Sequence, residues 1–96
     1  MYIVNNSYTV IINADFVEKF TIAENEDCVI VRAGHSDGTP PTTMGRYSDI
    51  KEARQALGEL LDALANGLSI FHMPDSPTYY EQRKIKDART RRKGGS

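Results

Sequence analysis

Two tyrosines stand beside two basic residues near the C-terminal end of the sequence, in the run Tyr79-Tyr80-Glu81-Gln82-Arg83-Lys84. A tyrosine ring can stack on a nucleobase, and an arginine or lysine can neutralise a phosphate. This combination predicts that Tyr79, Tyr80, Arg83 and Lys84 contact a phosphorylated nucleotide. A second interpretation stays open, in which Tyr80 only docks its segment on the rest of the domain.

Two further arginines are candidates for the same ligand. Arg46 precedes Tyr47 directly before the longest helical pattern, and Arg32 lies in an apolar strand pattern. We expect Tyr47 in the core, which leaves Arg46 open to a ligand, whereas an edge position would explain Arg32 equally well. Arg32 and Arg46 complete the predicted ligand-binding set.

The sequence holds little that could catalyse a reaction. His35 and Asp37 share a polar loop, but no third residue stands at the spacing of a metal site. Neither a nucleophile elbow nor a glycine-rich phosphate loop is present. We therefore expect no catalytic residue, no metal, no cofactor and no enzymatic activity.

The net charge of −1 conceals two regions of opposite sign. Residues 1–80 contain five bases against eleven acids, a net charge of −6, and residues 81–96 contain seven bases against two acids, a net charge of +5. A basic tail of this kind can stay solvated, or it can meet phosphates or the acidic surface of another copy.

Composition fixes the broad class of protein. A chain of 96 residues with 40% hydrophobic and 26% charged residues is typical of one small globular domain. No apolar run approaches the roughly 20 residues that span a bilayer, and no basic segment precedes Tyr2-Ile3-Val4 as in a signal peptide. The single Cys28 is expected to be a buried thiol. These features predict a cytoplasmic protein without membrane contact.

One amphipathic helix organises the predicted fold. Between Asp49 and Asn66 the apolar residues recur every three or four positions, the spacing of one helical stripe. Asp49 can cap the first turn, and Gly67 can close the helix in a left-handed conformation. We expect both Leu60 and Leu61 to be buried.

The segments before this helix alternate in polarity with period two, as strands do. The expected strands are Tyr2–Val4, Tyr8–Ile12, Phe16–Ala23, Cys28–Ala33 and Thr42–Tyr47. They predict an α+β fold: a small antiparallel sheet of four to five strands covered by one helix. Its uncovered face would carry Val17, Val29 and Val31 and would favour self-association.

The remaining segments complete the domain plan. Leu68–Met73 is either a further strand or a packed connector, and Thr78–Lys93 reads as a basic C-terminal helix. We divide the chain into a sheet-plus-helix domain at 1–73 and a basic helix and tail at 74–96.

From Tyr2-Ile3-Val4 through Gly45-Arg46-Tyr47-Ser48-Asp49 to Leu57, the layout resembles small proteins carried by phages and prophages of Gram-positive bacteria. A strand-rich N-terminal half followed by two C-terminal helices is also similar to the Thoeris anti-defence sponge family. The resemblance implies an oligomer that binds a cyclic ADP-ribose-type immune signal without degrading it. No ligand-contacting motif of that family can be matched here residue by residue.

The expected function is therefore counter-defence by sequestration of a small phosphorylated nucleotide signal, with the loop from Gly34 to Thr43 closing over the ligand. One alternative is an anti-CRISPR-type inhibitor of a host nuclease complex, which the acidic body favours and the basic tail disfavours. Another is nucleic-acid binding by the tail. In each case we expect a homo-oligomer, with the tail near acidic residues of a partner chain.

Overall fold

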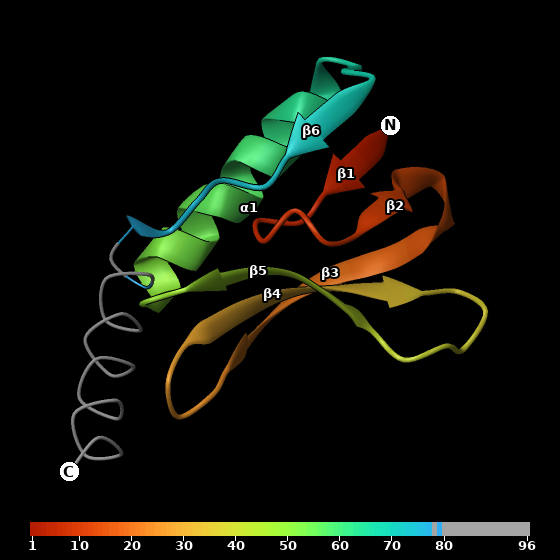
Figure 1. The fold of residues 1–96 in the computed structure, drawn as a ribbon. Helices are drawn as coiled ribbons and strands as arrows, with labels where there is room; N and C mark the ends of the chain where they lie inside the picture. The colour runs from red at the N-terminus through yellow and green to blue at the C-terminus, as the bar shows by residue number, and fades with distance from the viewer. Residues whose placement is uncertain (78, 80–96) are drawn as a thin grey trace, which may run out of the picture.

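The computed structural model describes residues 1–77 and 79 (Figure 1). Its elements follow in the order β1 (Tyr2–Val4), β2 (Ile11–Asn13), the 3-10 helix η1 (Ala14–Phe16), β3 (Val17–Glu24), β4 (Val29–His35), β5 (Thr42–Tyr47), α1 (Ile50–Ala65) and β6 (Ile70–His72). The fold belongs to the α+β class, as the sequence predicted. The expected helix over Thr78–Lys93 lies outside the described residues, apart from Tyr79.

The strands form two three-stranded sheets instead of the single sheet of four to five strands that we expected. The larger sheet has the antiparallel order β3-β4-β5. The smaller sheet has the order β2-β1-β6, in which β1 pairs antiparallel with β2 and parallel with β6. The segment Leu68–Met73 thus contains a strand, over Ile70–His72. After the C-terminal end of α1 the chain turns back, and β6 runs beside the N-terminal strand β1 (Figure 1).

Helix α1 begins and ends where its capping residues predict. The Asp49 carboxylate accepts a hydrogen bond from the Glu52 backbone N–H at 2.8 Å, which satisfies a donor that the first turn leaves free. Gly67 follows the last turn with φ of +66°, in the left-handed region that glycine adopts without strain. The Glu52 side chain does not complete a capping box, because its carboxylate accepts from the Ser48 hydroxyl at 2.9 Å.

The buried stripe of α1 is narrower than its apolar pattern. Leu60 is fully buried, whereas Leu61 is 58% exposed, so the expectation that Leu61 belongs to the core was wrong. Alanines supply the rest of the buried face, at 53, 56 and 63. Leu57 packs against the edge of this core, whereas Leu61 and Leu64 are exposed on the flank of the helix.

The face of the larger sheet under α1 holds the core. Val29, Val31 and Ala33 of β4 cluster there with Met44 and Tyr47 of β5. Val29 and Val31 are therefore covered, and our expectation that they line an open face was wrong. The open apolar face belongs to the smaller sheet instead.

A β-bulge corrects the predicted orientation of β3. Val17 pairs with His35 and Lys19 with Gly34, so Glu18 is an extra residue in this strand. The bulge places Val17 on the side that packs against the core, and Phe16, which ends η1 instead of belonging to the strand, is exposed; this reverses the plain period-two pattern. It also explains how Glu18 reaches solvent within an apolar strand.

Gly45 gives the ring of Tyr47 its space. A Cβ atom at Gly45 would lie 2.5 Å from Cε2 of that ring. The two residues share a strand face because they are two positions apart, and the absence of a side chain at 45 lets the ring fold back over the strand. The buried Tyr47 hydroxyl donates to the Pro74 carbonyl at 2.9 Å, which ties β5 to the segment after β6.

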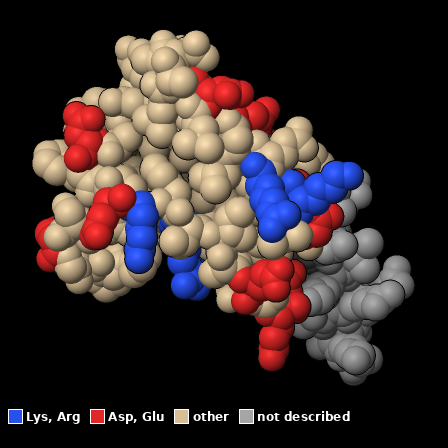
Figure 2. Space-filling view, turned by 180° about the vertical axis from the view of Figure 1, so that it is seen from behind, with Lys and Arg blue, Asp and Glu red and all other residues tan. Residues whose placement is uncertain are grey.

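On the face seen from behind, the described residues are mostly uncharged, and acidic and basic side chains are scattered among them (Figure 2). Among the described residues, no helix is long and apolar enough to cross a membrane. Cys28 is buried and unpaired, as expected from its position.

Candidate anion-binding site

The loop between β1 and β2 is organised by the buried side chain of Asn5. Its carboxamide oxygen accepts from the backbone N–H groups of Thr9 (2.9 Å) and Val10 (3.0 Å). Its amide nitrogen donates to the hydroxyls of Ser7 and Thr9, each at 3.0 Å. One asparagine therefore satisfies four groups and fixes both hydroxyls in place.

The next residue, Asn6, fastens this loop to the larger sheet. Its backbone N–H donates to the Met44 carbonyl at 3.0 Å. Its side chain donates to the Arg46 carbonyl at 3.1 Å and accepts from the Arg46 N–H at 3.3 Å. Asn6 thus pairs with the edge of β5 that β4 leaves free, and it binds the backbone of Arg46 on both sides of the amide. The Arg46 side chain remains exposed.

A cleft of about 220 Å³ lies between the loop and β5. Its walls are polar except for one residue, and the lining residues are Asn5, Asn6, Ser7, Thr9, Val10, Thr42, Thr43 and Arg46. Residues with hydroxyl groups and one arginine therefore line a single small space, while the side-chain amides of Asn5 and Asn6 are already hydrogen-bonded within the protein. Such a set of donors suits an anion with several oxygen atoms.

Counting hydrogens shows that one hydroxyl of the loop can donate to a ligand. The oxygens of Ser7 and Thr9 lie 2.9 Å apart, so one O–H donates to the other oxygen. Both oxygens also accept from Asn5, and the described residues offer the second O–H no acceptor. This free donor lies on the wall of the cleft that Arg46 also lines.

Arg32 and Arg46 lie on the same face of the larger sheet. Arg46 pairs with Ile30 across the β4–β5 ladder, and Arg32 stands two residues after Ile30 on β4. An irregularity of the ladder lies between Val31 and Arg32, and with its extra residue on β5 both arginines remain on the face opposite Val31. β4 is the central strand, so the edge position that could explain Arg32 does not apply.

No carboxylate among the described residues forms an ion pair with either guanidinium. Lys19 stands on this same side, because its Cγ atom would lie 3.3 Å from a Cβ atom at Gly34, two residues after Arg32. The face beside the cleft thus carries three cations, although residues 1–80 are acidic as a whole.

The structure therefore places the predicted ligand-binding residues in different regions. It brings Arg32 and Arg46 together, and it puts only Arg46 in the wall of the cleft. Tyr79 is half-buried beyond β6, where its N–H donates to the Ser76 hydroxyl at 3.3 Å, and it does not line the cleft. Tyr80, Arg83 and Lys84 lie outside the described residues.

Sequence reasoning missed the polar lining of the cleft. Asn5-Asn6-Ser7 has the composition of a tight turn, and that composition hid its second role. One feature of the sequence could have indicated this role, namely two adjacent asparagines directly after an apolar strand. One of them can form hydrogen bonds to the backbone of the turn, and the other to the backbone of a neighbouring strand. The residue Tyr8, with φ of +57°, marks the strained centre of the same loop.

The first residue of β5, directly after the loop that follows β4, contributes to the far wall of the cleft. Thr42 lines the cleft, and its hydroxyl lies 2.7 Å from the Nε2 atom of His35. At the tip of the loop, hydrogen bonds from the Thr39 hydroxyl (2.7 Å) and N–H (3.0 Å) lower the pKa of Asp37 below its usual 3.8. No group of three potential metal-ligating side chains occurs in the described part of the chain.

Comparison of the chain with protein-family models found no matching family, and comparisons with curated proteins and with solved structures found no match.

Proposed function

We propose that this protein binds a small phosphorylated nucleotide in the cleft between the β1–β2 loop and β5, and that it does not cleave the ligand. The observation that carries the proposal is that Arg46, Ser7, Thr9 and Thr43 all line one space of about 220 Å³. Arginine pairs with phosphate oxygens through two parallel hydrogen bonds, and hydroxyls supply further donors.

The size of the cleft favours a small ligand. Pockets that bury a drug-sized molecule enclose roughly 300–1,000 Å³, so a cleft of about 220 Å³ takes a phosphate and part of its sugar. Val10 gives the sugar or the edge of a base an apolar wall. Arg32, on the same sheet face, can pair with a second phosphate group.

Sequestration follows from binding without chemistry. A protein that holds a signalling nucleotide and returns it unchanged lowers the free concentration of that signal. This is the role of a counter-defence protein of a phage, the function that the resemblance of the sequence implied. The cationic face supports it, since Arg32 and Arg46 have no carboxylate partner among the described residues and are available to phosphate.

Titration calorimetry tests the proposal. The probes are cyclic ADP-ribose isomers, cyclic di- and trinucleotides, inorganic phosphate and duplex DNA, each at low and physiological salt. We expect one small nucleotide to bind at physiological salt and to be recovered intact by chromatography. Arg46→Ala should weaken its binding by roughly 10- to 100-fold, because a hydrogen bond to a charged group is worth about 1.5–3 kcal/mol.

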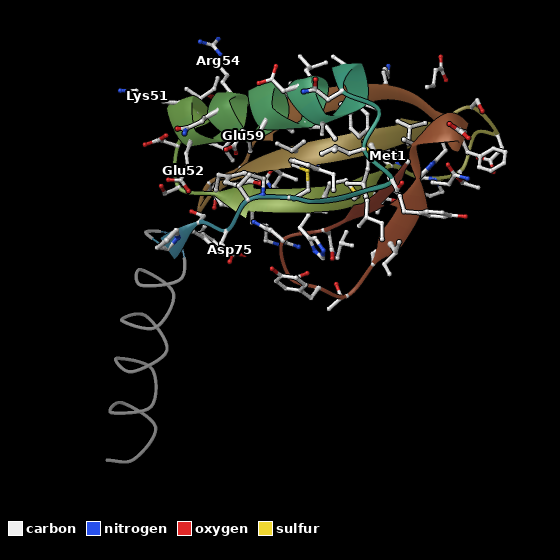
Figure 3. All side chains as sticks on the ribbon, turned by 90° about the horizontal axis from the view of Figure 1, so that it is seen from above. Met1, Lys51, Glu52, Arg54, Glu59 and Asp75 are labelled. Carbon is white, nitrogen blue, oxygen red and sulfur yellow. The ribbon has the colours of Figure 1, made fainter. Side chains whose placement is uncertain are left out.

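Arg54→Ala is the matched control. Arg54 lies on the exposed side of α1 and points away from both sheets, as does Lys51 (Figure 3). Its loss removes the same charge without touching the cleft, and affinity should stay unchanged. Equal weakening by Arg46→Ala and Arg54→Ala would indicate non-specific attraction, and an absence of nucleotide binding at both salt concentrations would refute the proposal.

A further inference from the structure

The outer face of the smaller sheet is mostly apolar and largely exposed; only Val4, on the central strand β1, is buried there, at 8% exposure. The core side of this sheet consists of Ile3, Ile12 and Phe71, and the register places their neighbours on the opposite side. That opposite side, here called the β1 outer face, consists of Tyr2, Val4, Ile11, Ile70 and His72, with Asn13 at one corner. Tyr8 extends it, because its ring lies against that of His72 at a centroid distance of 5.8 Å.

This face carries no ionisable acid, lysine or arginine. The sequences of β1, β2 and β6 contain none of these residues, whereas β3, β4 and β5 all contain charged side chains. A solvated sheet face is normally polar at these positions. Depletion of charge together with tyrosine and aliphatic residues is the composition found at the centre of protein interfaces.

The exposed area is large enough for an interface. Tyr2 is 54% exposed, Ile11 66% and Ile70 57%. With Tyr8 they present roughly 500 Å² of side-chain surface, taking about 200 Å² for each side chain when fully exposed. This area lies in the upper half of the range of about 300–600 Å² for the largest apolar patch of a typical monomer, and such patches are often functional.

We propose that the β1 outer face packs against the same face of a second copy of this chain. A two-fold axis brings identical patches together, so an uncharged apolar face on one copy meets an equally apolar face on the other. Two such faces bury roughly 1,000 Å² before any rim contact is counted, the minimum for a specific interface. Sheets packed face to face lie about 10 Å apart, a gap that Tyr2, Ile11 and Ile70 from both copies can fill.

A membrane surface fits this face less well. Interfacial binding combines apolar side chains with lysine and arginine that meet lipid phosphates. The three cations beside the cleft stand on the larger sheet, and the strands of the β1 outer face have none. The chemistry of this face therefore matches a second apolar protein surface.

Light scattering coupled to gel filtration tests the dimer on the full chain. At about 50 µM we expect a mass of twice the chain mass of 10.7 kDa. Ile11→Thr and Ile70→Thr keep a β-branched residue for strand pairing but remove apolar surface. Each should weaken self-association by about tenfold or more, as truncation of a central interface residue does.

Leu61→Thr is the matched control, because Leu61 is similarly exposed but lies on the flank of α1. It should leave the dimer intact, and circular dichroism should show that all three variants remain folded. A wild-type mass of one chain would overturn the proposal, as would a dimer that dissociates with Leu61→Thr and persists with both isoleucine variants. Because Arg46→Ala leaves this face untouched, that variant should stay dimeric even where it no longer binds nucleotide.

Discussion

The two sheets of this protein differ in how far their apolar residues are covered by the rest of the chain. The larger sheet has one face under α1, where an apolar cluster is closed by Leu60 and alanines, and another face that carries cations. The smaller sheet shares the same core through Ile3, yet its other face is apolar and open. The apolar residues of the larger sheet are thus covered within one chain, whereas the smaller sheet leaves apolar residues exposed on its outer side.

The two regions also differ in the interactions that fix their backbone. Strands β3, β4 and β5 are fixed by ladders and by side-chain packing, whereas the β1–β2 loop is fixed by the hydrogen bonds of Asn5 and Asn6. Close packing fixes the positions of apolar side chains, and the polar network fixes the positions of hydrogen-bond donors in the loop. The cleft lies where these two regions meet.

The largest expected effect concerns the core under α1. Leu60→Ala should lower the free energy of unfolding by about 2–5 kcal/mol, because it leaves a cavity in a fully buried site. Leu61→Ala should change it by less than about 0.5 kcal/mol, as for other surface positions. Urea unfolding of both variants measures the contrast, and similar losses would mean that the buried stripe of α1 is wider than the structure shows.

A second change strains β5. Gly45→Ala should cost about 1–3 kcal/mol, since the new methyl group meets the ring of Tyr47 and forces it to move. Gly58→Ala is the control: a Cβ atom there has nothing within 4 Å, and removing a mid-helix glycine should stabilise the protein by about 0.5–1 kcal/mol. Thermal unfolding compares them, and the same sign of change in both would contradict the contact.

A third change removes the hydrogen bonds that the Asn5 side chain forms in the β1–β2 loop. Asn5→Ala should cost about 1–2 kcal/mol, in the lower part of the range for unsatisfied groups because water can reach the loop. Ser7→Ala removes one hydroxyl contact and should cost less than Asn5→Ala. The Thr9 and Val10 N–H groups donate to the Asn5 side chain, so their rates of hydrogen exchange should rise in Asn5→Ala. Unchanged protection of these amides would argue against the central role of this side chain.

The smallest expected effect on stability concerns the pH dependence that Asp37 contributes, in the loop after β4. Hydrogen bonds from Thr39 lower the pKa of Asp37, so the folded state binds its proton less tightly than the unfolded state does. The resulting stabilisation is present above the usual pKa of 3.8 and is lost as the pH falls through the lowered value. NMR titration should give a midpoint below 3.8 that rises in Thr39→Ala; an equal midpoint in both proteins would exclude this cause.

Much of the fold follows from local sequence signals. The bounds of β5 and of α1 agree with the sequence analysis, because Asp49 and Gly67 act within one helical turn. The position of Val17 could not be predicted, since a bulge at Glu18 depends on the partner strand. Of the candidate site, the sequence yielded Arg32 and Arg46, and it did not show that Asn5 and Asn6 would build the opposite wall.

By itself, then, the sequence determined the α+β class, the helix with its caps, and the cationic residues that could meet a phosphate. Only the tertiary structure decided which apolar residues of α1 are buried, because the helix turns the side of Ala53, Ala56, Leu60 and Ala63 toward the sheet, and Leu61 lies about 100° around the helix from Leu60. It also decided the partner of β1, since the parallel pairing with β6 joins segments more than sixty residues apart. Period-two patterns specify which faces a strand has, but the identity of its neighbour depends on long-range packing, and that packing here leaves the β1 outer face uncovered.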